Sequence, residues 1–438
     1  MMLEAFRAYI QTISQEDGKH QFSLDSVLEM GQGLKAIELL REALNAQKQI
    51  IIGGDYDCDG MSGTALVLYF FKEVLHYPHI NYIIPQRNTD CYGMSVELLE
   101  EYENKRRLVR THYKNGQPIG GIALNLHNSL FITIDNGATI PDSVCDFLHA
   151  RNTRLILSDH HHFLENHIPK CDAFIHPLLN DNHPFKGISG ACVGYLFMLA
   201  YAKQHKIKMR LDHLQYMQVL AGISTIGDMM DVSAPYNRQL LKRMDKTLKT
   251  HMPASLQAIY NAQKYKNPYK LSTLAWDVIP LINAVGRFDG ISGFCHCNLV
   301  VDLLATQQAN PAYAALLVEA NEKRKICVQS LKKSLETTQK NKLIYTGGEV
   351  PRGVLGVLAN QLLENEGVCI ALCWRYQGES VEVSLRAKEG DLIVLFTRFK
   401  EMGIEVLGGG HKQACGMVFN NDADFNRALE YLGGLDAL

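Results

Sequence analysis

Three aspartates stand close together in the stretch IIIGGDYDCDG, and their spacing is the first feature of this sequence that could support chemistry. They are Asp55, Asp57 and Asp59, at alternate positions shortly after an apolar run. Carboxylates that lie close together repel one another unless a cation stands between them. The spacing therefore predicts a site for a cation.

Three further segments carry residues of the same kind. FITIDNG contains Asp135, TRLILSDHHH leads into Asp159, His160 and His161, and Asp228 ends the helix-like run YMQVLAGISTIGD. Any one of these aspartates alone could simply cap the N-terminus of a helix. Together with the first cluster they offer hard oxygen ligands and imidazole, a set that suits Mn²⁺ or Mg²⁺ better than zinc. The joint pattern therefore predicts a divalent metal site.

The elements that must position these residues follow one repeated pattern. Residues 49–52 are short and β-branched and precede glycines, which is typical of a buried strand, and residues 62–75 have helical spacing after a Ser/Thr start. We therefore expect residues 55–59 on a loop between strand and helix. Residues 131–134 and 155–157 repeat the strand pattern. Strands that alternate with helices predict a doubly wound parallel sheet, in which ligands bind beyond the carboxyl ends of the strands.

The composition is that of a globular protein with large cores. The chain has 438 residues, of which 47% are hydrophobic and 21% charged, and a formal net charge of -2. This length favours two domains. The net charge excludes a generally polycationic nucleic-acid coat but permits a local basic groove.

The motifs DYDCDG, IDNG, DHH and GDMMD occur in this order and resemble the four signature motifs of the DHH phosphoesterase superfamily. Within it, the chain is most similar to the RecJ branch of single-strand-specific exonucleases. Five further segments carry that resemblance: PQRNTDCYGMS, HPLLND, INAVGR, GVLGVLANQL and LGGGHKQACG.

The resemblance implies an α/β protein of two parts. Residues 1–231 would form the doubly wound parallel-sheet DHH domain, residues 232–275 a helical linker, and residues 276–438 a smaller α/β DHH-associated domain that binds substrate. The active site would lie in the cleft between the two domains. The printed sequence ends about twenty residues after the last motif, whereas an OB-fold needs about one hundred residues, so we expect the catalytic core without the OB-fold usual in this branch.

The same resemblance implies roles for the metal-site residues. Asp57 and Asp59 would each hold a different metal ion, and Asp135 would bridge the two. Asp55 would complete the first site, and His160 with Asp228 the second. The cofactors would be two Mn²⁺ or Mg²⁺ ions about 4 Å apart, which activate water for phosphoryl displacement.

The remaining candidate residues would act on the substrate and in catalysis. Asp159 would orient a neighbouring histidine, and His161 would contact the scissile phosphate. The residues expected to bind substrate lie in matched motifs, or next to one, and are Asn283, Arg287, Arg386, Gly409, Gly410 and His411.

These features predict a metal-dependent 5′ to 3′ exonuclease that hydrolyses single-stranded nucleic acid, with DNA favoured over RNA, to 5′-mononucleotides. One alternative is a phosphodiesterase for short oligonucleotides of the nanoRNase or cyclic-dinucleotide type, whose first motif usually begins with histidine. Another is a non-catalytic RecJ-like scaffold, which would tolerate loss of metal ligands. A single-strand binding protein is a possible partner, and the sequence leaves the oligomeric state open.

The sequence also predicts a cytoplasmic protein. The first residues lack a long apolar core before a small-residue cleavage site, and no apolar stretch approaches the length of a membrane span. The eleven cysteines are scattered without paired C-x-x-C spacing, which fits reduced thiols.

Overall fold

The computed structural model describes residues 28–90, 92–109, 112–114, 117–163, 168–180, 183, 185–264, 269–288 and 297–435. The side chains of residues 112–114, 117–119 and 411 lie outside this description. Contacts divide the chain into two compact units, Met1–Asn321 and Glu322–Leu438, which are described separately. Among the described residues, no helix is long and apolar enough to cross a membrane.

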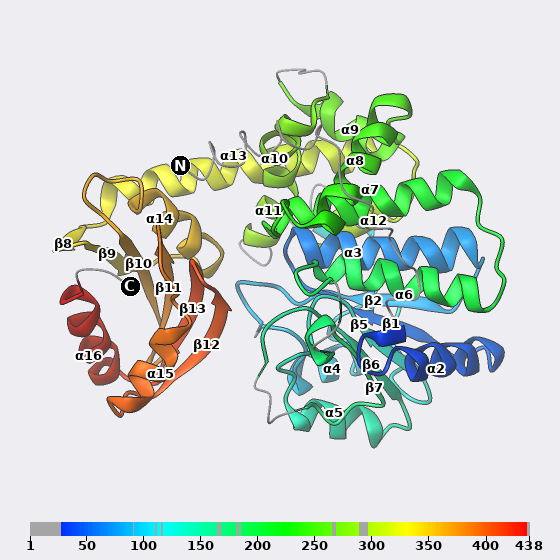
Figure 1. Cartoon of the computed structure of the whole chain (residues 1–438), viewed down its shortest axis with the longest axis horizontal. Helices are drawn as coiled ribbons and strands as arrows, with labels where there is room; N and C mark the ends of the chain where they lie inside the picture. Colours follow the sequence, from blue (N-terminus) through cyan, green and yellow to red (C-terminus); the bar gives the residue numbers. More distant parts are fainter. Residues whose placement is uncertain are drawn as a thin grey trace. The chain divides into compact units, whose positions relative to one another are not determined.

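The first unit mixes strands and helices as far as β7 and is helical from α6 onward (Figure 1). Its elements are α2 (Gly33–Asn45), β1 (Ile50–Gly53), α3 (Cys58–Tyr69), η2 (Phe70–Val74), β2 (Ile80–Ile83), α4 (Val96–Glu103), β3 (His112–Lys114), β4 (Gln117–Ile119), β5 (Leu130–Thr133), α5 (Asp142–His149), β6 (Arg154–Ser158), β7 (Ala173–Ile175), η3 (Pro177–Leu179), α6 (Gly190–Gln204), α7 (Leu211–Gly227), α8 (Pro235–Thr250), α9 (Ala254–Ala262), α10 (Leu271–Asp277), α11 (Ile279–Phe288) and α12 (Asn298–Leu304).

The described strands of this unit form a five-stranded sheet in the order β2-β1-β5-β6-β7, and every pair in it is parallel. This confirms the predicted doubly wound sheet. Ile51, Phe131 and Leu155 stand in register on neighbouring strands and pack in one core with α4 and α5. Helices α3 and α6 cover the opposite face (Figure 1).

Helix α3 is buried along its whole length, between the sheet and helices α6 and α7. It begins at Cys58, four residues before the predicted start, because the Asp57 carboxylate caps it by accepting hydrogen bonds from the backbone of Asp59 and Gly60. Asp59 therefore lies in the first helical turn, and its predicted place on the loop was wrong.

The residues predicted as a linker, 232–275, contain α8, α9 and the first part of α10. Helix α8 ends at Thr250 and α9 begins after Pro253, whose ring cannot sit inside a helix without removing a hydrogen bond. The boundary between units also differs from the expected start at residue 276. Helix α12 packs on α3, and Asp302 accepts a hydrogen bond of 2.8 Å from the Tyr82 hydroxyl, so this region belongs to the first unit.

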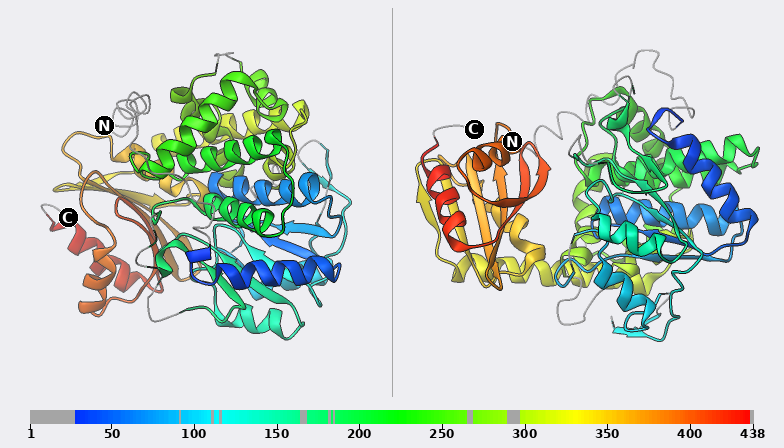
Figure 2. Two further views of the ribbon diagram at one scale, coloured as in Figure 1. Left: turned by 45° about the vertical axis from the view of Figure 1, so that its right-hand side comes forward. Right: turned by 90° about the horizontal axis from the view of Figure 1, so that it is seen from below.

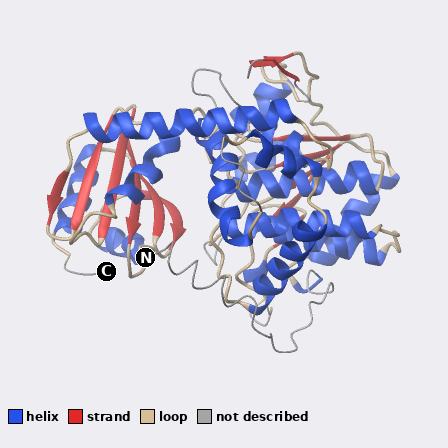
Figure 3. Ribbon diagram, turned by 90° about the horizontal axis from the view of Figure 1, so that it is seen from above, coloured by secondary structure: helices blue, strands red, loops and turns tan. Residues whose placement is uncertain are grey.

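The boundary falls inside α13 (Pro311–Ser334), and the second unit is a mixed α/β domain (Figures 2 and 3). Its further elements are β8 (Thr338–Lys340), β9 (Leu343–Gly348), η4 (Arg352–Val354), α14 (Leu355–Leu362), β10 (Ile370–Gln377), β11 (Ser380–Ala387), α15 (Val394–Glu401), β12 (Val406–His411), β13 (Ala414–Phe419) and α16 (Asp422–Gly433). The sheet order is β12-β13-β11-β10-β9-β8, and only β9 and β10 pair in parallel. Helices α15 and α16 close a large apolar core on one face, and α14 packs on the other.

Candidate metal centre

The predicted acidic residues meet at the carboxyl ends of three neighbouring strands. Asp55 follows β1, Asp135 follows β5, and the Asp159–His161 segment follows β6. The strand order reverses between β1 and β5, since the chain runs outward from β1 to β2 and then returns to β5 on the other side. Such a reversal opens a crevice beyond the strand ends, where ligands bind in sheets of this type.

Three overlapping groups of side chains could each hold a metal ion, because their ligand atoms lie within 4.8 Å of one another. They are Asp55, Asp57 and Asp135; Asp59, His160 and Asp228; and Asp135, His160 and His161. Asp135 and His160 each belong to two groups, so the third group joins the first to the second. All six aspartates and histidines predicted as metal ligands are thus brought together.

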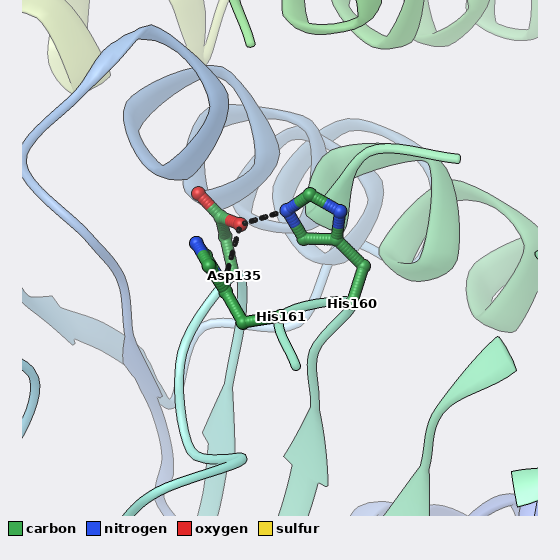
Figure 4. A group of neighbouring side chains, drawn as sticks. All are labelled: Asp135, His160 and His161. Carbon is green, nitrogen blue, oxygen red and sulfur yellow. Dashed lines mark ion pairs between the residues drawn. The ribbon is translucent and has the colours of Figure 1, made fainter. Parts of the chain in front are cut away.

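His160 lies at the centre of this cluster. Its Nε2 atom lies 3.2 Å from Asp135 Oδ1, 3.4 Å from Asp228 Oδ2 and 3.6 Å from Asp59 Oδ2. Figure 4 shows the imidazole of His160 facing the Asp135 carboxylate, and the ion pairs of His160 and His161 meet at the same oxygen, Asp135 Oδ1. One imidazole nitrogen is therefore surrounded by three carboxylates.

Asp135 is held in an uncommon backbone conformation. Its φ is 63°, in the left-handed region that few residues with a side chain adopt. Its amide donates a 3.0 Å hydrogen bond to the carbonyl of Ser158, and a Cβ added at Gly190 would lie 2.3 Å from Asp135 Oδ1. Helix α6 thus packs directly against this carboxylate, and only glycine fits there. Backbone strain of this kind is common where a fold fixes a functional group.

Several carboxylate oxygens in the cluster are buried without a hydrogen-bond donor among the described residues. They are both oxygens of Asp135, Oδ1 of Asp55 and Oδ2 of Asp228. Buried charged atoms need a counter-charge or a donor, because removal from water is costly. The donor set of oxygen and imidazole and these unsatisfied oxygens both fit a divalent cation of the Mn²⁺ or Mg²⁺ kind.

The acidity of the cluster shows the same need for positive charge. Burial, followed by the charge of Asp57, raises the pKa of Asp55 to about 8 and that of Asp59 to about 6. Burial, followed by the charge of Asp59 and the other aspartates, raises the pKa of Asp135 and of Asp228 well above the ordinary value. A bound cation reverses this penalty because it favours the ionised carboxylates.

Asp159 is directed away from the metal-ligand groups and fixes its neighbours. Its Oδ1 accepts hydrogen bonds from the amide of His160 at 2.7 Å and from His161 Nδ1 at 2.8 Å, and its Oδ2 accepts one from the amide of Ala138 at 2.7 Å. Burial opposes charge on His161, but the charge and hydrogen bond of Asp159 outweigh it and raise the pKa of His161 to about 10. The imidazolium of His161 therefore has one nitrogen bound to Asp159, while its Nε2 lies 3.5 Å from the hydroxyl of the partly exposed Tyr92.

Asn283, which we expected to bind substrate, supports the loop of residues 54–57, which we call the metal loop. Its Oδ1 accepts a 3.0 Å hydrogen bond from the amide of Cys58, the first residue of α3. A Cβ added at Gly286 would lie 1.8 Å from the carbonyl oxygen of Tyr56. The carbonyl of Arg287 accepts a 2.9 Å hydrogen bond from the Asn88 side chain. The NAVGR segment therefore supports the loop that carries Asp55 and Asp57.

The predicted substrate residues of the second unit lie on the interior strand β11 and on the edge strand β12, where Arg386 and His411 both stand in register with Ala414 of β13. Arg386 donates to Ser384 Oγ at 3.0 Å, and its guanidinium approaches the start of α14, where a Cβ on Gly356 would meet it at 2.5 Å. Gly409 is exposed, with no atom within 4 Å of an added Cβ, and Gly410 has a φ of 145° that favours glycine. His411 ends β12, and its side chain lies outside the described part of the chain.

The sequence reasoning missed the residues that hold Asp59. Its two oxygens accept hydrogen bonds from the amides of Gly190 and Ala191, both at 2.8 Å, and from Ser224 Oγ at 2.5 Å. Two signals could have indicated them. Ser189 directly precedes the apolar run GACVGYLFMLA, as a residue that caps a helix N-terminus does, and Ser224 precedes Asp228 by four residues, which places both on the same face of the helix-like run.

Comparison with known families agrees with this architecture. A model of the DHH family, N-terminal domain, matches residues 49–223, and a model of the DHHA1 domain matches residues 339–434. Residues 49–223 are therefore a DHH N-terminal domain, and residues 339–434 are a DHHA1 domain.

Its relatives include RecJ exonucleases. The single-stranded-DNA-specific exonuclease RecJ of Haemophilus influenzae is 26% identical over 300 residues, 66% of this chain and 47% of that protein. The Escherichia coli RecJ is 25% identical over 352 residues, 75% of this chain and 56% of that protein. The chain thus spans about half the length of the curated relatives it matches. A crystal structure of exonuclease RecJ bound to manganese superposes with a TM-score of 0.69 at 24% identity, covering 95% of this chain and 97% of that one.

Proposed function

We propose that this protein is a metal-dependent phosphodiesterase that hydrolyses single-stranded nucleic acid, with DNA favoured, from the 5′ end to 5′-mononucleotides. The RecJ relatives, which are single-stranded-DNA-specific exonucleases, support the reaction class and the substrate. RecJ structures with Mn²⁺ and with Mg²⁺ support the cofactor.

One observation carries the proposal: Asp135 shares one ligand group with Asp55 and Asp57 and another with His160, and its oxygens have no hydrogen-bond donor among the described residues. In this assignment Asp55 and Asp57 would hold one ion. The other ion would be held by Asp59, His160 and Asp228. Asp135 serves both ions.

Different residues of the chain would bind the metal ions and contact the scissile phosphate. When bound, the two divalent ions would activate water and stabilise the entering and leaving oxygens of an in-line displacement at phosphorus. Asp159 holds the imidazolium of His161 in a fixed orientation through its hydrogen bond to Nδ1. The Nε2–H group of His161 then donates to a non-bridging oxygen of the scissile phosphate, where negative charge develops.

Contacts with the rest of the strand come from cationic and glycine residues. Arg287 and Arg386 are half-buried, and a guanidinium group can form bidentate hydrogen bonds with a phosphate. Gly409 and Gly410 give the edge strand β12 little side-chain bulk, so that a ligand can approach its backbone, and His411 would bind substrate at the end of this strand. The side-chain oxygen of Asn283 supports the metal loop through the amide of Cys58, and its side-chain nitrogen would donate a hydrogen bond to the substrate.

A non-catalytic scaffold would have no reason to retain this cluster. Buried carboxylates that repel one another destabilise a fold, and a scaffold could replace them with apolar residues of similar size. Every ligand position instead carries a residue that can bind a metal ion. The intact ligand set therefore favours an enzyme.

The proposal is tested by digestion of single strands of graded length that carry a label at the 5′ or the 3′ end. With Mn²⁺ present, we expect a 5′ label to appear at once as mononucleotide, while a 3′ label remains on progressively shorter strands. EDTA should abolish both. Release of mononucleotide first from the 3′ end would refute the polarity, and cleavage confined to strands of two to five nucleotides would favour the oligonucleotide phosphodiesterase. Absence of hydrolysis by a metal-loaded protein would favour the scaffold.

A cytoplasmic location and a single-strand binding protein as partner stay predictions from the sequence. Pull-down from an extract with the purified chain, with and without added single-stranded DNA, would test the partner.

A further inference from the structure

We infer that Ser224 is a positioning residue that presents one oxygen of Asp59 to the metal centre and fixes the distance between Asp59 and Asp228. This inference rests on the proposed metal site. It concerns a residue that makes no contact with substrate in the proposed function, and it adds a requirement to that site.

The first step is the set of partners around Asp59, whose side chain is almost fully buried. Its Oδ1 accepts from Ser224 Oγ at 2.5 Å and from the amide of Ala191 at 2.8 Å. Its Oδ2 accepts from the amide of Gly190 at 2.8 Å and lies 3.6 Å from His160 Nε2. Two donors therefore occupy Oδ1, and Oδ2 is the oxygen that faces the other ligands.

The second step is the direction of the hydroxyl hydrogen bonds. An ionised carboxylate can only accept, so Ser224 donates its single hydroxyl proton to Asp59. The contact of 2.5 Å between Ser189 Oγ and Ser224 Oγ must then have Ser189 as its donor. Ser189 in turn accepts from the amide of Cys192 at 3.4 Å, as the N-cap of α6. Both serines are fully buried, and each hydroxyl in this series has one allowed orientation.

The third step is the link to Asp228, one helical turn further along α7. The carbonyl of Ser224 accepts a 2.9 Å hydrogen bond from the amide of Asp228. One residue thus contacts two members of the ligand group that also contains His160: Asp59 through its side chain and Asp228 through its backbone. A hydrogen bond that orients a ligand in this way commonly changes metal affinity by about 10- to 100-fold when it is lost.

The inference is tested by calorimetric titration of Mn²⁺ into the metal-free wild-type chain and into Ser224→Ala, Ser224→Thr and Ser255→Ala. Ser255 is the matched control, because it is also fully buried in the first unit and hydrogen-bonded to a hydroxyl, that of Tyr216 at 3.0 Å, yet belongs to none of the candidate ligand groups. We expect two binding events in the wild type. Ser224→Ala should weaken one of them by at least about 10-fold, whereas Ser224→Thr, which keeps the hydroxyl, and Ser255→Ala should bind as the wild type does.

Thermal unfolding in EDTA separates positioning from a merely structural role. The melting temperature of Ser224→Ala should fall no further than that of Ser255→Ala, because each loses one buried hydroxyl. If Ser224→Ala fails to fold, Ser224→Cys replaces it, since the thiol keeps the size of the side chain and is a weaker donor. Two unchanged Mn²⁺ affinities in a folded Ser224→Ala or Ser224→Cys chain would overturn the inference alone. A wild-type chain that binds no Mn²⁺ would overturn the proposed metal site together with it.

Discussion

Buried acids have different surroundings in the two units. In the first unit, Asp55, Asp59 and Asp135 are buried near one another, and Asp135 has only the imidazoles of His160 and His161 as ion-pair partners among the described residues. In the second unit, the buried Glu382 has Arg352 Nε at 3.1 Å and Arg375 Nε at 3.6 Å. The second unit neutralises its acid with its own side chains. The first unit keeps an excess of buried carboxylates, which a bound divalent cation would balance.

The comparison is tested most severely by Asp135→Asn, which removes one charge from the joined ligand groups. Asparagine tolerates the left-handed φ of this position, so the fold should be preserved. Hydrolysis of labelled strands with Mn²⁺ should fall at least about 1000-fold. In EDTA the melting temperature should equal or exceed that of the wild type, because one repelling charge is gone. Asp212→Asn, at a surface ion pair with Arg210, is the control. Near wild-type hydrolysis would show that this carboxylate serves no ion.

His161→Ala should have the next largest effect and should separate catalysis from metal binding. Loss of one donor to the developing charge should raise the activation free energy by about 2 to 4 kcal/mol. Steady-state rates give this value, and Mn²⁺ titration should give unchanged affinities. A variant that no longer binds one of the ions would instead make His161 a ligand, as its group with Asp135 and His160 permits.

Gly286→Ala should damage the first unit from outside the ligand cluster. The added Cβ would lie 1.8 Å from the carbonyl oxygen of Tyr56, between two of the predicted ligands. Overpacking of this kind costs about 1 to 3 kcal/mol in the free energy of unfolding, and the displaced loop should weaken Mn²⁺ binding. Gly187→Ala, where nothing lies within 4 Å of the added Cβ, is the matched control. Equal denaturant midpoints and Mn²⁺ affinities for both variants would contradict the supporting role of the NAVGR segment.

Glu382→Gln should affect the second unit alone. It removes the charge shared by Arg352 and Arg375, and we expect a loss of about 1 to 3 kcal/mol in stability. Denaturant titration measures this loss. The Mn²⁺ affinities should stay at the wild-type values, because the charge balance of this unit is internal. A change in Mn²⁺ affinity would break the contrast between the two units.

Gly409→Ala should produce the smallest change in stability, within about 0.5 kcal/mol, because the position is exposed and open. If a substrate strand approaches the backbone here, the methyl group should raise the KM for long strands and leave the turnover number unchanged. An unchanged KM would remove Gly409 from the proposed substrate surface.

The parallel sheet and the meeting of the acidic residues beyond its strand ends could be predicted from the sequence, because both depend on local patterns. β1 is formed by three isoleucines and a glycine, and Asp55 follows it as expected. The place of Asp59 was not predictable in the same way, since the start of α3 depends on which aspartate caps it. Asn283 contacts the amide of Cys58 because tertiary packing brings α11 to the start of α3. A sequence motif names the residue type but does not identify this contact.

The two compact units divide after Asn321, beyond the domain start expected at residue 276, for a related reason. Helices α9 and α12 have apolar faces with buried residues such as Leu256, Ile259 and Leu299. Such a face predicts burial but does not identify the surface that buries it. The structure packs α12 on α3 and on α9, within the first unit.

The order of the strands also determines when the metal centre can form. Its ligands follow β1, β5 and β6 and end α7, so they are far apart along the chain and meet only after the parallel pairs have formed. Closure of such long loops makes parallel pairing slow. The cation therefore joins a nearly finished fold. It should slow unfolding and leave the rate of folding almost unchanged, so that it increases the kinetic stability of the native chain.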